Sequence, residues 1–280
     1  MNYPLFTSCQ VGDFLVTVLN DGTMSASLDL LSGIETFDAE AIQQNAGIVE
    51  PDNIHINCYL IRGRGRIILV DTGTGGQNKA GGQLKTNLAA AGVSPDDVDT
   101  VLLTHGHPDH IGGLLDAQGL PVYKNAELYL HTLEAEYWWN DEKQEMVNER
   151  GKRNFRLARR TLDAYAQRVH FFTGDEITEG ILPVWLPGHT PGHTGFRIGS
   201  GDNSLLIWGD IVHYPHIQLT KPTVSILFDC DPIQAADTRE KVLKHVVREK
   251  LMIAGMHLGP TGFATVSMAE NGYRIVYSQE

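Results

Sequence analysis

The chain has 280 residues, of which 42% are hydrophobic, so it is long enough to bury a substantial core. Its 34 acidic residues outnumber the 22 Lys and Arg residues, and the formal charge of -12 disfavours nucleic acid and an anionic membrane as partners. No apolar run reaches the roughly 20 residues of a membrane-spanning helix, and no signal peptide is recognisable. Cys9, Cys58 and Cys230 form no CxxC pair, which predicts reduced thiols and a cytoplasmic protein.

Alternating apolar residues and turn residues predict two hairpins, a helix and a strand in the first part of the chain. The first hairpin is expected to turn at Asp21 and Gly22, a pair typical of tight β-turns. The predicted elements are a hairpin over residues 13–24, a hairpin of residues 57–61 and 66–70, a helix over residues 83–91 and a strand over residues 100–103.

Residues 134–167 are rich in charged and aromatic side chains and are predicted to form helices that cover a pocket. After them the pattern returns to short strands, followed by an amphipathic helix and a closing hairpin. The predicted elements are strands at 169–172, 181–186, 196–198 and 205–208, a helix at 237–249, a strand at 251–254 and a hairpin at 263–277.

Residues 1–280 are interpreted as a single domain with two β-rich halves. The helical segment at about 134–167 is then an insertion in this domain. Two sheets that face each other, each with helices on its outer side, form a four-layer αββα sandwich, and this α/β fold is our prediction.

The most specific motif is the segment Thr-His-Gly-His-Pro-Asp-His at residues 104–110, which directly follows an apolar strand. Imidazole and carboxylate groups together suit a borderline metal ion such as zinc, iron or manganese. Side chains two residues apart in an extended loop can converge on one ion. The motif therefore predicts a metal site whose ligands are His105, His107, Asp109 and His110.

Three further candidates share one sequence context. His189, Asp210 and His257 each follow a short apolar strand, with a glycine within two residues before them. A single histidine near a strand is more often structural than a ligand. Their repeated position after a strand favours instead a shared location at the end of the sheets, where binding sites commonly lie.

These motifs resemble the metallo-β-lactamase superfamily over most of the chain, from residues 71–73 to His257. The resemblance implies two divalent metal ions, most often zinc, with iron, manganese or cobalt as alternatives. It implies that His105, His107 and His189 hold the first ion, that Asp109, His110 and His257 hold the second, and that Asp210 bridges them.

Within the superfamily, a histidine directly after Asp109 and the absence of a cysteine ligand are closer to glyoxalase II, lactonases and methyl parathion hydrolase than to antibiotic-degrading enzymes. Segments 210–213 and 228–232 look most similar to the methyl parathion hydrolase group. Lactonases of the superfamily usually carry a tyrosine three residues after the bridging aspartate, where this chain has His213. Tyr214 is adjacent, but neighbouring side chains on a strand point to opposite faces.

Two other features of the sequence bear on the site: the polar residues Asp71 and His213, and a glycine-rich loop. Asp71 and His213 are predicted to orient ligands, because a carboxylate or imidazole behind a metal ligand fixes its position. The glycine-rich loop at residues 73–76 lacks the Lys and spacing of a phosphate-binding loop, and no G-x-S-x-G motif indicates a serine nucleophile.

The expected reaction is the attack of a hydroxide bridging the two ions on an ester, lactone or phosphotriester, with Asp109 or Asp210 accepting the proton. The substrate is expected to be a small neutral or apolar ester, because the candidate pocket residues are mostly aromatic and no basic cluster for the carboxylates of glutathione is evident in the sequence. The predicted pocket residues are Trp138, Trp139, Phe196, Tyr214, His216 and Phe228.

Two alternatives use the same fold. The ligand types also suit iron, so a di-iron oxygenase such as a persulfide dioxygenase remains open. A sensor without catalysis that binds a small signalling molecule is the other alternative, and the complete ligand set argues against it. The resemblance also implies a homodimer.

Overall fold

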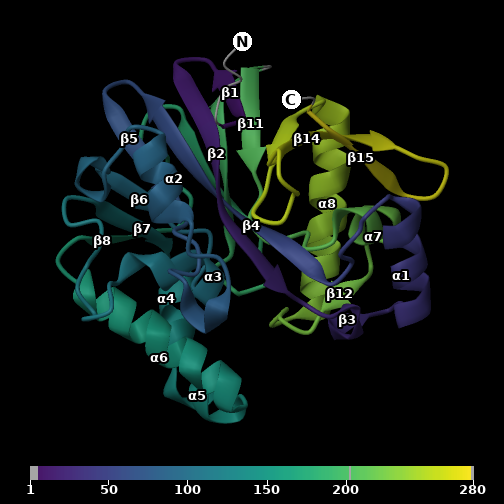
Figure 1. Ribbon diagram of the computed structural model, residues 1–280, viewed down its shortest axis with the longest axis horizontal. Helices are drawn as coiled ribbons and strands as arrows, with labels where there is room; N and C mark the ends of the chain where they lie inside the picture. Colours follow the sequence, from purple (N-terminus) through teal and green to yellow (C-terminus); the bar gives the residue numbers. More distant parts are fainter. Residues whose placement is uncertain (1–5, 202, 279–280) are drawn as a thin grey trace.

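Two β-sheets face each other in the computed structural model, which describes residues 6–201 and 203–278 (Figure 1). In this part of the chain the first sheet has seven strands in the order β1-β2-β4-β5-β6-β7-β8. Their bounds are β1 Ser8–Val11, β2 Phe14–Ser25, β4 Asn53–Gly63, β5 Arg66–Val70, β6 Thr100–Leu102, β7 Glu127–His131 and β8 Val169–Phe172. The strands from β1 to β5 pair antiparallel, and those from β5 to β8 pair parallel.

The second sheet has six strands in the described residues, in the order β15-β14-β13-β11-β10-β9. Only β11 and β13 pair parallel, and the other neighbours are antiparallel. The bounds are β9 Ile181–Trp185, β10 Thr194–Ser200, β11 Asn203–Ile207, β13 Met252–Ala254, β14 Phe263–Met268 and β15 Tyr273–Tyr277. A small two-stranded sheet joins β3 (Leu31–Ser32) to β12 (Ser225–Ile226).

Helices cover the outer face of each sheet. Figure 1 shows α2, α4 and α6 on the side of the first sheet and α1, α7 and α8 on the side of the second. The helices are α1 Thr36–Asn45, α2 Leu84–Ala90, α3 Pro108–Ile111, α4 Thr132–Trp139, α5 Asp141–Met146, α6 Glu149–Ala164, α7 Pro215–Thr220 and α8 Pro232–Glu249. No helix in the described part of the chain is long and apolar enough to cross a membrane.

Side-chain alternation along β4 explains the layers. Tyr59 and Ile61 point into the apolar core between the two sheets, whereas Cys58 and Leu60 point into a second core beneath the helices of the first sheet. A third core lies between the second sheet and α8, where Val242 is one of the packed residues. The three cores separate four layers, so the predicted αββα sandwich is confirmed.

The predicted turn at Asp21 and Gly22 is wrong. Strand β2 continues through these residues with only a register shift against β4, and the hairpin turn lies instead between β1 and β2. Asp21 is fully buried, and its carboxylate accepts hydrogen bonds from the backbone nitrogens of Thr74 at 2.9 Å and Leu84 at 2.8 Å. Aspartate is common in turns, but the side chain of Asp21 instead holds the glycine-rich loop and the start of α2 in place.

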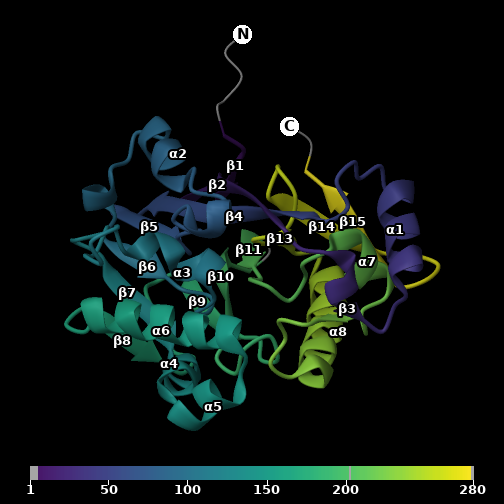
Figure 2. The same ribbon diagram turned by 60° about the horizontal axis from the view of Figure 1, so that its bottom comes forward.

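The second half of the chain follows the predicted elements closely, with one shift at a helix start. Helix α8 begins at Pro232 rather than at residue 237, because the Asp231 side chain caps it by accepting from the Gln234 backbone nitrogen. Three helices, α4 to α6, occupy the segment predicted to be helical, and Asn140 and Asn148 cap the second and third of them. Figure 2 shows α6 and α8 on opposite sides of the centre of the molecule.

Candidate metal centre

Seven side chains, which we call the metal cradle, come together from loops that directly follow strands. Helix α3 and the turn before it follow β6, and the other three loops follow β9, β11 and β13. These four loops lie at the same end of the sandwich, as the sequence context predicts. The metal cradle consists of His105, His107, Asp109, His110, His189, Asp210 and His257.

The first half of the metal cradle consists of three imidazole rings. The His107 Nδ1 atom lies 3.0 Å from His105 Nε2 and 3.0 Å from His189 Nε2. The two Nε2 atoms of His105 and His189 are 3.2 Å apart. Three ring nitrogens this close together form a cluster that could hold one metal ion.

The second half combines carboxylates and imidazoles around Asp210. The Asp210 Oδ2 atom lies 3.1 Å from His110 Nε2 and 3.2 Å from His257 Nε2. Asp109 Oδ2 lies 3.3 Å from His110 Nε2. The same Asp210 oxygen is 3.6 Å from His189 Nε2, so this carboxylate connects the two halves.

Hydrogen bonds behind the ligands fix which ring nitrogen faces the cradle. His110 donates from Nδ1 to Asp71 Oδ2 at 2.7 Å, and His257 donates from Nδ1 to the His55 carbonyl oxygen at 2.6 Å. His189 donates from Nδ1 to a carboxylate oxygen of Asp229 at 2.8 Å. In all three residues the Nε2 lone pair is therefore directed at the centre, which is the tautomer that a metal ligand needs.

The charge state of the histidines differs between the two halves. Burial, with the neighbouring histidines, holds the pKa of His105 and His107 well below the usual value, so these rings are neutral. Burial also disfavours a charge on His110, but Asp210 and Asp109 outweigh it and raise the pKa of His110 well above its usual value. The carboxylate half attracts positive charge, and a cation is the natural occupant of both halves.

The donor atoms of the metal cradle require a positively charged occupant. Neutral rings that turn lone pairs toward one another at 3.0–3.2 Å repel unless a proton or cation lies between them. Asp210 Oδ1 is buried and has no hydrogen-bond partner in the described part of the chain. Nitrogen and carboxylate oxygen donors in this combination fit zinc, iron or manganese.

Asp71, which is predicted to orient a metal ligand, lies directly behind His110. Its two carboxylate oxygens also accept from the Thr104 backbone nitrogen at 2.8 Å and the Thr104 hydroxyl at 2.7 Å. The backbone of Asp71 has a φ of 58°, which is uncommon for a residue with a side chain. Such a conformation is held only where surrounding contacts fix it, and here they hold the loop that carries His105.

Glu134 was not predicted and links two of the metal-binding loops. One of its oxygens accepts from the Gly106 backbone nitrogen at 2.9 Å and from Trp138 Nε1 at 2.7 Å. The other accepts from the Thr190 hydroxyl at 2.6 Å and from the Gly192 backbone nitrogen at 3.1 Å. A fully buried carboxylate with four donors thus ties the His107 loop to the His189 loop.

His193 was also absent from the prediction and supports the loop of Asp210. Its Nδ1 donates to the Leu186 carbonyl oxygen at 2.8 Å, and its Nε2 accepts from the Asp210 backbone nitrogen at 2.9 Å. Burial lowers the pKa of His193 to about 3, so the ring stays neutral and can accept. Gly209 has a φ of 60°, and a Cβ atom there would lie 2.4 Å from His193 Nε2, which explains the glycine before Asp210.

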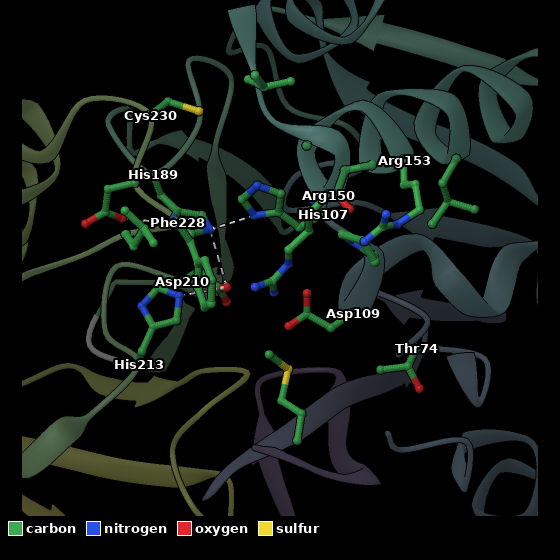
Figure 3. A pocket seen from close by; sticks show the side chains of 18 of the residues that line it. Thr74, His107, Asp109, Arg150, Arg153, His189, Asp210, His213, Phe228 and Cys230 are labelled. Carbon is green, nitrogen blue, oxygen red and sulfur yellow. Dashed lines mark hydrogen bonds and ion pairs between the residues drawn. The ribbon is translucent and has the colours of Figure 1, made fainter. Parts of the chain in front are cut away.

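A pocket of about 1330 Å³ opens onto the metal cradle (Figure 3). Two of the six predicted pocket residues, Trp138 and Phe228, line it. Trp139 instead packs against Phe171, because adjacent helix residues point in different directions. Phe196 lies in the core between the sheets.

Two further pocket predictions are corrected in the segment after Asp210. Tyr214 is buried in the core near α7 and donates a hydrogen bond to the Ala26 carbonyl oxygen, so its phenol is directed away from the metal cradle. His216 packs near Tyr277 at a ring distance of 6.1 Å and does not line the pocket. His213 does lie beside the cradle, with its Nε2 atom 3.3 Å from Asp210 Oδ2.

The family model of the metallo-beta-lactamase superfamily matches residues 51–257, a range that contains the whole metal cradle. The chain belongs to this superfamily. In the mouse, metallo-beta-lactamase domain-containing protein 1 is 55% identical over 47 residues, which is 17% of either chain. That match is too short to carry the activity of the mouse protein to this chain.

Solved structures of superfamily members match over nearly the whole length. The hydrolase AbOPH has a TM-score of 0.91 and 28% sequence identity, covering 100% of this chain and 99% of that one. AidC, a dizinc quorum-quenching lactonase in complex with the product N-hexanoyl-L-homoserine, has a TM-score of 0.92 and 25% identity, covering 98% of each chain. One of these structural neighbours is thus a hydrolase, and the other is a lactonase with two zinc ions.

Proposed function

We propose that this chain is a metal-dependent hydrolase that uses two divalent ions, zinc in the first instance, to cleave a carboxylic ester or a lactone. The observation that carries the proposal is the Asp210 carboxylate, which lies within 3.6 Å of ring nitrogens from both halves of the metal cradle. The cradle opens onto a pocket large enough for a small organic substrate. The dizinc lactonase AidC, similar along nearly its whole length, supports the ester or lactone class.

In this proposal His105, His107 and His189 would hold one ion, Asp109, His110 and His257 the other, and Asp210 both. When bound there, two such ions would supply a hydroxide nucleophile near neutral pH, because a water on such ions has a pKa of about 7, and would polarise the substrate's carbonyl oxygen. The ring partners described above orient the ligand rings so that Nε2 of His110, His189 and His257 faces the metal cradle.

Asp109 is the proposed proton acceptor. Its side chain is 15% exposed toward the pocket, whereas that of Asp210 is 3% exposed. Burial alone would raise the pKa of Asp109, but the adjacent His110 outweighs burial and holds it below the usual value. The carboxylate is therefore ionised at neutral pH and can take a proton at the pocket side of the metal cradle.

The first experiment measures metal content by elemental analysis of protein purified without chelator, together with hydrolysis of p-nitrophenyl acetate, an acyl-homoserine lactone and methyl paraoxon. We expect two metal ions per chain, and turnover of the ester or the lactone that is lost with chelator and restored by zinc. His107→Ala should lose turnover, whereas His245→Ala, on the outer helix α8, should keep it. Two bound iron atoms with no hydrolysis would reject the proposal and favour the oxygenase alternative.

A further inference from the structure

The pocket has a positively charged wall that the sequence analysis did not anticipate. Arg150 and Arg153, which we call the α6 wall, both line the pocket from the first turns of α6, and Lys143 of α5 lines it as well. In Figure 3 Arg150 points into the pocket between Phe228 on one side and Asp109 on the other. With Lys79, four cations therefore line the same cavity as the metal cradle, in a chain whose formal charge is -12.

The α6 wall lacks the ion pairs that two other cations of the same helix, Lys152 and Arg159, have. Lys152 pairs with Glu145 at 2.8 Å, and Arg159 pairs with Asp141 at 2.8 Å. Within residues 6–201 and 203–278, no carboxylate oxygen lies within 4.0 Å of a guanidinium nitrogen of Arg150 or Arg153. The charges that face the pocket are thus free to bind an anion.

A contact with an aromatic ring positions Arg150 of the α6 wall in spite of its unfavourable electrostatic setting. Arg150 lies in the first turn of the 16-residue helix α6, where the helix dipole disfavours positive charge, and Arg153 lies in the second turn. The guanidinium carbon of Arg150 lies 4.9 Å from the centre of the Phe228 ring, a cation–π contact that holds it across the pocket. An anion bound between the two arginines would offset the cost of placing them at this helix end.

We propose that Arg150 and Arg153 bind an anionic group of the substrate, a carboxylate or a phosphate, remote from the bond that is cleaved. The inference rests on the proposed hydrolase function and makes the substrate class more specific: an ester or lactone that carries a negative charge on its leaving or acyl part. It replaces the neutral or apolar substrate expected from the sequence. Arginine suits this role because its planar fork matches carboxylate and phosphate oxygens.

The test compares two aryl acetates that differ in one charge. The substrate 4-acetoxybenzoate is anionic, and its methyl ester is neutral with a similar leaving group. In the zinc-loaded protein we expect kcat/KM to be higher for the anion, mainly through a lower KM. Arg150→Ala and Arg153→Ala should each lower the anionic-to-neutral ratio of kcat/KM by roughly tenfold, the size expected for loss of one charged hydrogen bond.

A matched control comes from the same helix. Arg156 is exposed on α6 and does not line the pocket, so Arg156→Ala should leave the ratio unchanged within about twofold. An unchanged ratio in the Arg150→Ala/Arg153→Ala double variant, with full turnover of the neutral ester, would overturn the inference and leave the hydrolase proposal intact. Loss of bound metal in the double variant would also overturn it, because the arginines would then serve the metal cradle.

A binding measurement separates the inference from catalysis. Calorimetric titration of the zinc-loaded protein with 4-methoxybenzoate, which cannot be hydrolysed, should give an affinity that falls roughly tenfold or more in the double variant. The neutral ketone 4-methoxyacetophenone, which has a similar shape and no bond to hydrolyse, should bind both proteins equally. If no ester is hydrolysed but this difference appears, the proposed function fails and the anion site stands; equal binding of the benzoate to both proteins overturns the anion site.

Discussion

The metal cradle and the α6 wall line the same pocket but are held in place by different forces. His110 and His189 of the cradle are buried and are each held by a carboxylate at 2.7–2.8 Å. The arginines of the wall are exposed, and the contact that positions Arg150 is the face of Phe228. Rigid support suits groups that must hold a metal in a fixed geometry, whereas long side chains suit recognition of a substrate. We therefore expect cradle variants to lose the reaction and wall variants to change only which substrate is used.

The largest effect is expected for Asp210→Asn, because this carboxylate belongs to both halves of the metal cradle. Loss of metal-based charge stabilisation costs several kcal/mol, so turnover should fall at least roughly a thousandfold. Elemental analysis should show loss of both ions. His107→Ala, which affects only the first half, should lose one ion, and the comparison of the two variants tests the connecting role.

Retention of two ions in Asp210→Asn would contradict the arrangement. Far-UV circular dichroism of both variants provides the control for folding. Because the three apolar cores contain no residue of the metal cradle, we expect the spectra to match that of the parent protein.

A smaller effect, on metal affinity, is expected for a residue that contacts a metal ligand from behind. Asp229→Asn removes the negative charge that faces His189 Nδ1, and loss of such a partner typically weakens metal affinity by roughly 10- to 100-fold. Competition with a zinc chelator measures this affinity. Asp237→Asn, an exposed acid on α8, is the matched control and should bind zinc as the parent does. Equal affinities in the two variants would show that Asp229 does not support the cradle.

Glu134→Gln should act on stability more than on chemistry. The amide can keep one acceptor oxygen, but its NH2 group would face donors, among them the Gly106 or Gly192 backbone nitrogen. A buried donor left without a partner costs about 2 kcal/mol, so the free energy of unfolding should fall by that amount in denaturant titration. Glu136→Gln, exposed on the same helix, should leave it unchanged. A change in turnover larger than the change in stability would assign Glu134 to the chemistry instead.

The layers of the fold could be predicted from the sequence, and so could the meeting of the seven side chains of the metal cradle, because both follow from local patterns. The strand positions follow from apolar alternation, and four of the seven cradle residues lie within the six residues from His105 to His110. The predicted hairpin turn at Asp21 failed for a nonlocal reason, since its carboxylate is used by Thr74, 53 residues away. A turn-forming residue type does not reveal whether its side chain is needed elsewhere.

The supporting residues and the pocket could not be predicted, because they depend on contacts between distant segments. Glu134 meets Gly106 across 28 residues and Asp229 meets His189 across 40. An acid flanked by apolar residues, as Glu134 is by Leu133 and Ala135, is the one local hint of burial. Whether Trp138 or Trp139 faces the pocket depends on how α4 is rotated about its axis, which is set by its packing against distant segments.

The smallest expected effect is at the contact between Phe228 and Arg150. Phe228→Ala removes a cation–π contact at 4.9 Å, which at an exposed site corresponds to roughly a two- to fivefold change in binding. Steady-state kinetics with 4-acetoxybenzoate should show KM raised by that factor with kcat unchanged. Phe228→Tyr, which keeps an aromatic face, should retain the parent KM. A fall in kcat would mean that Phe228 supports the metal cradle rather than the α6 wall, and the division between reaction and recognition would then lie elsewhere in the pocket.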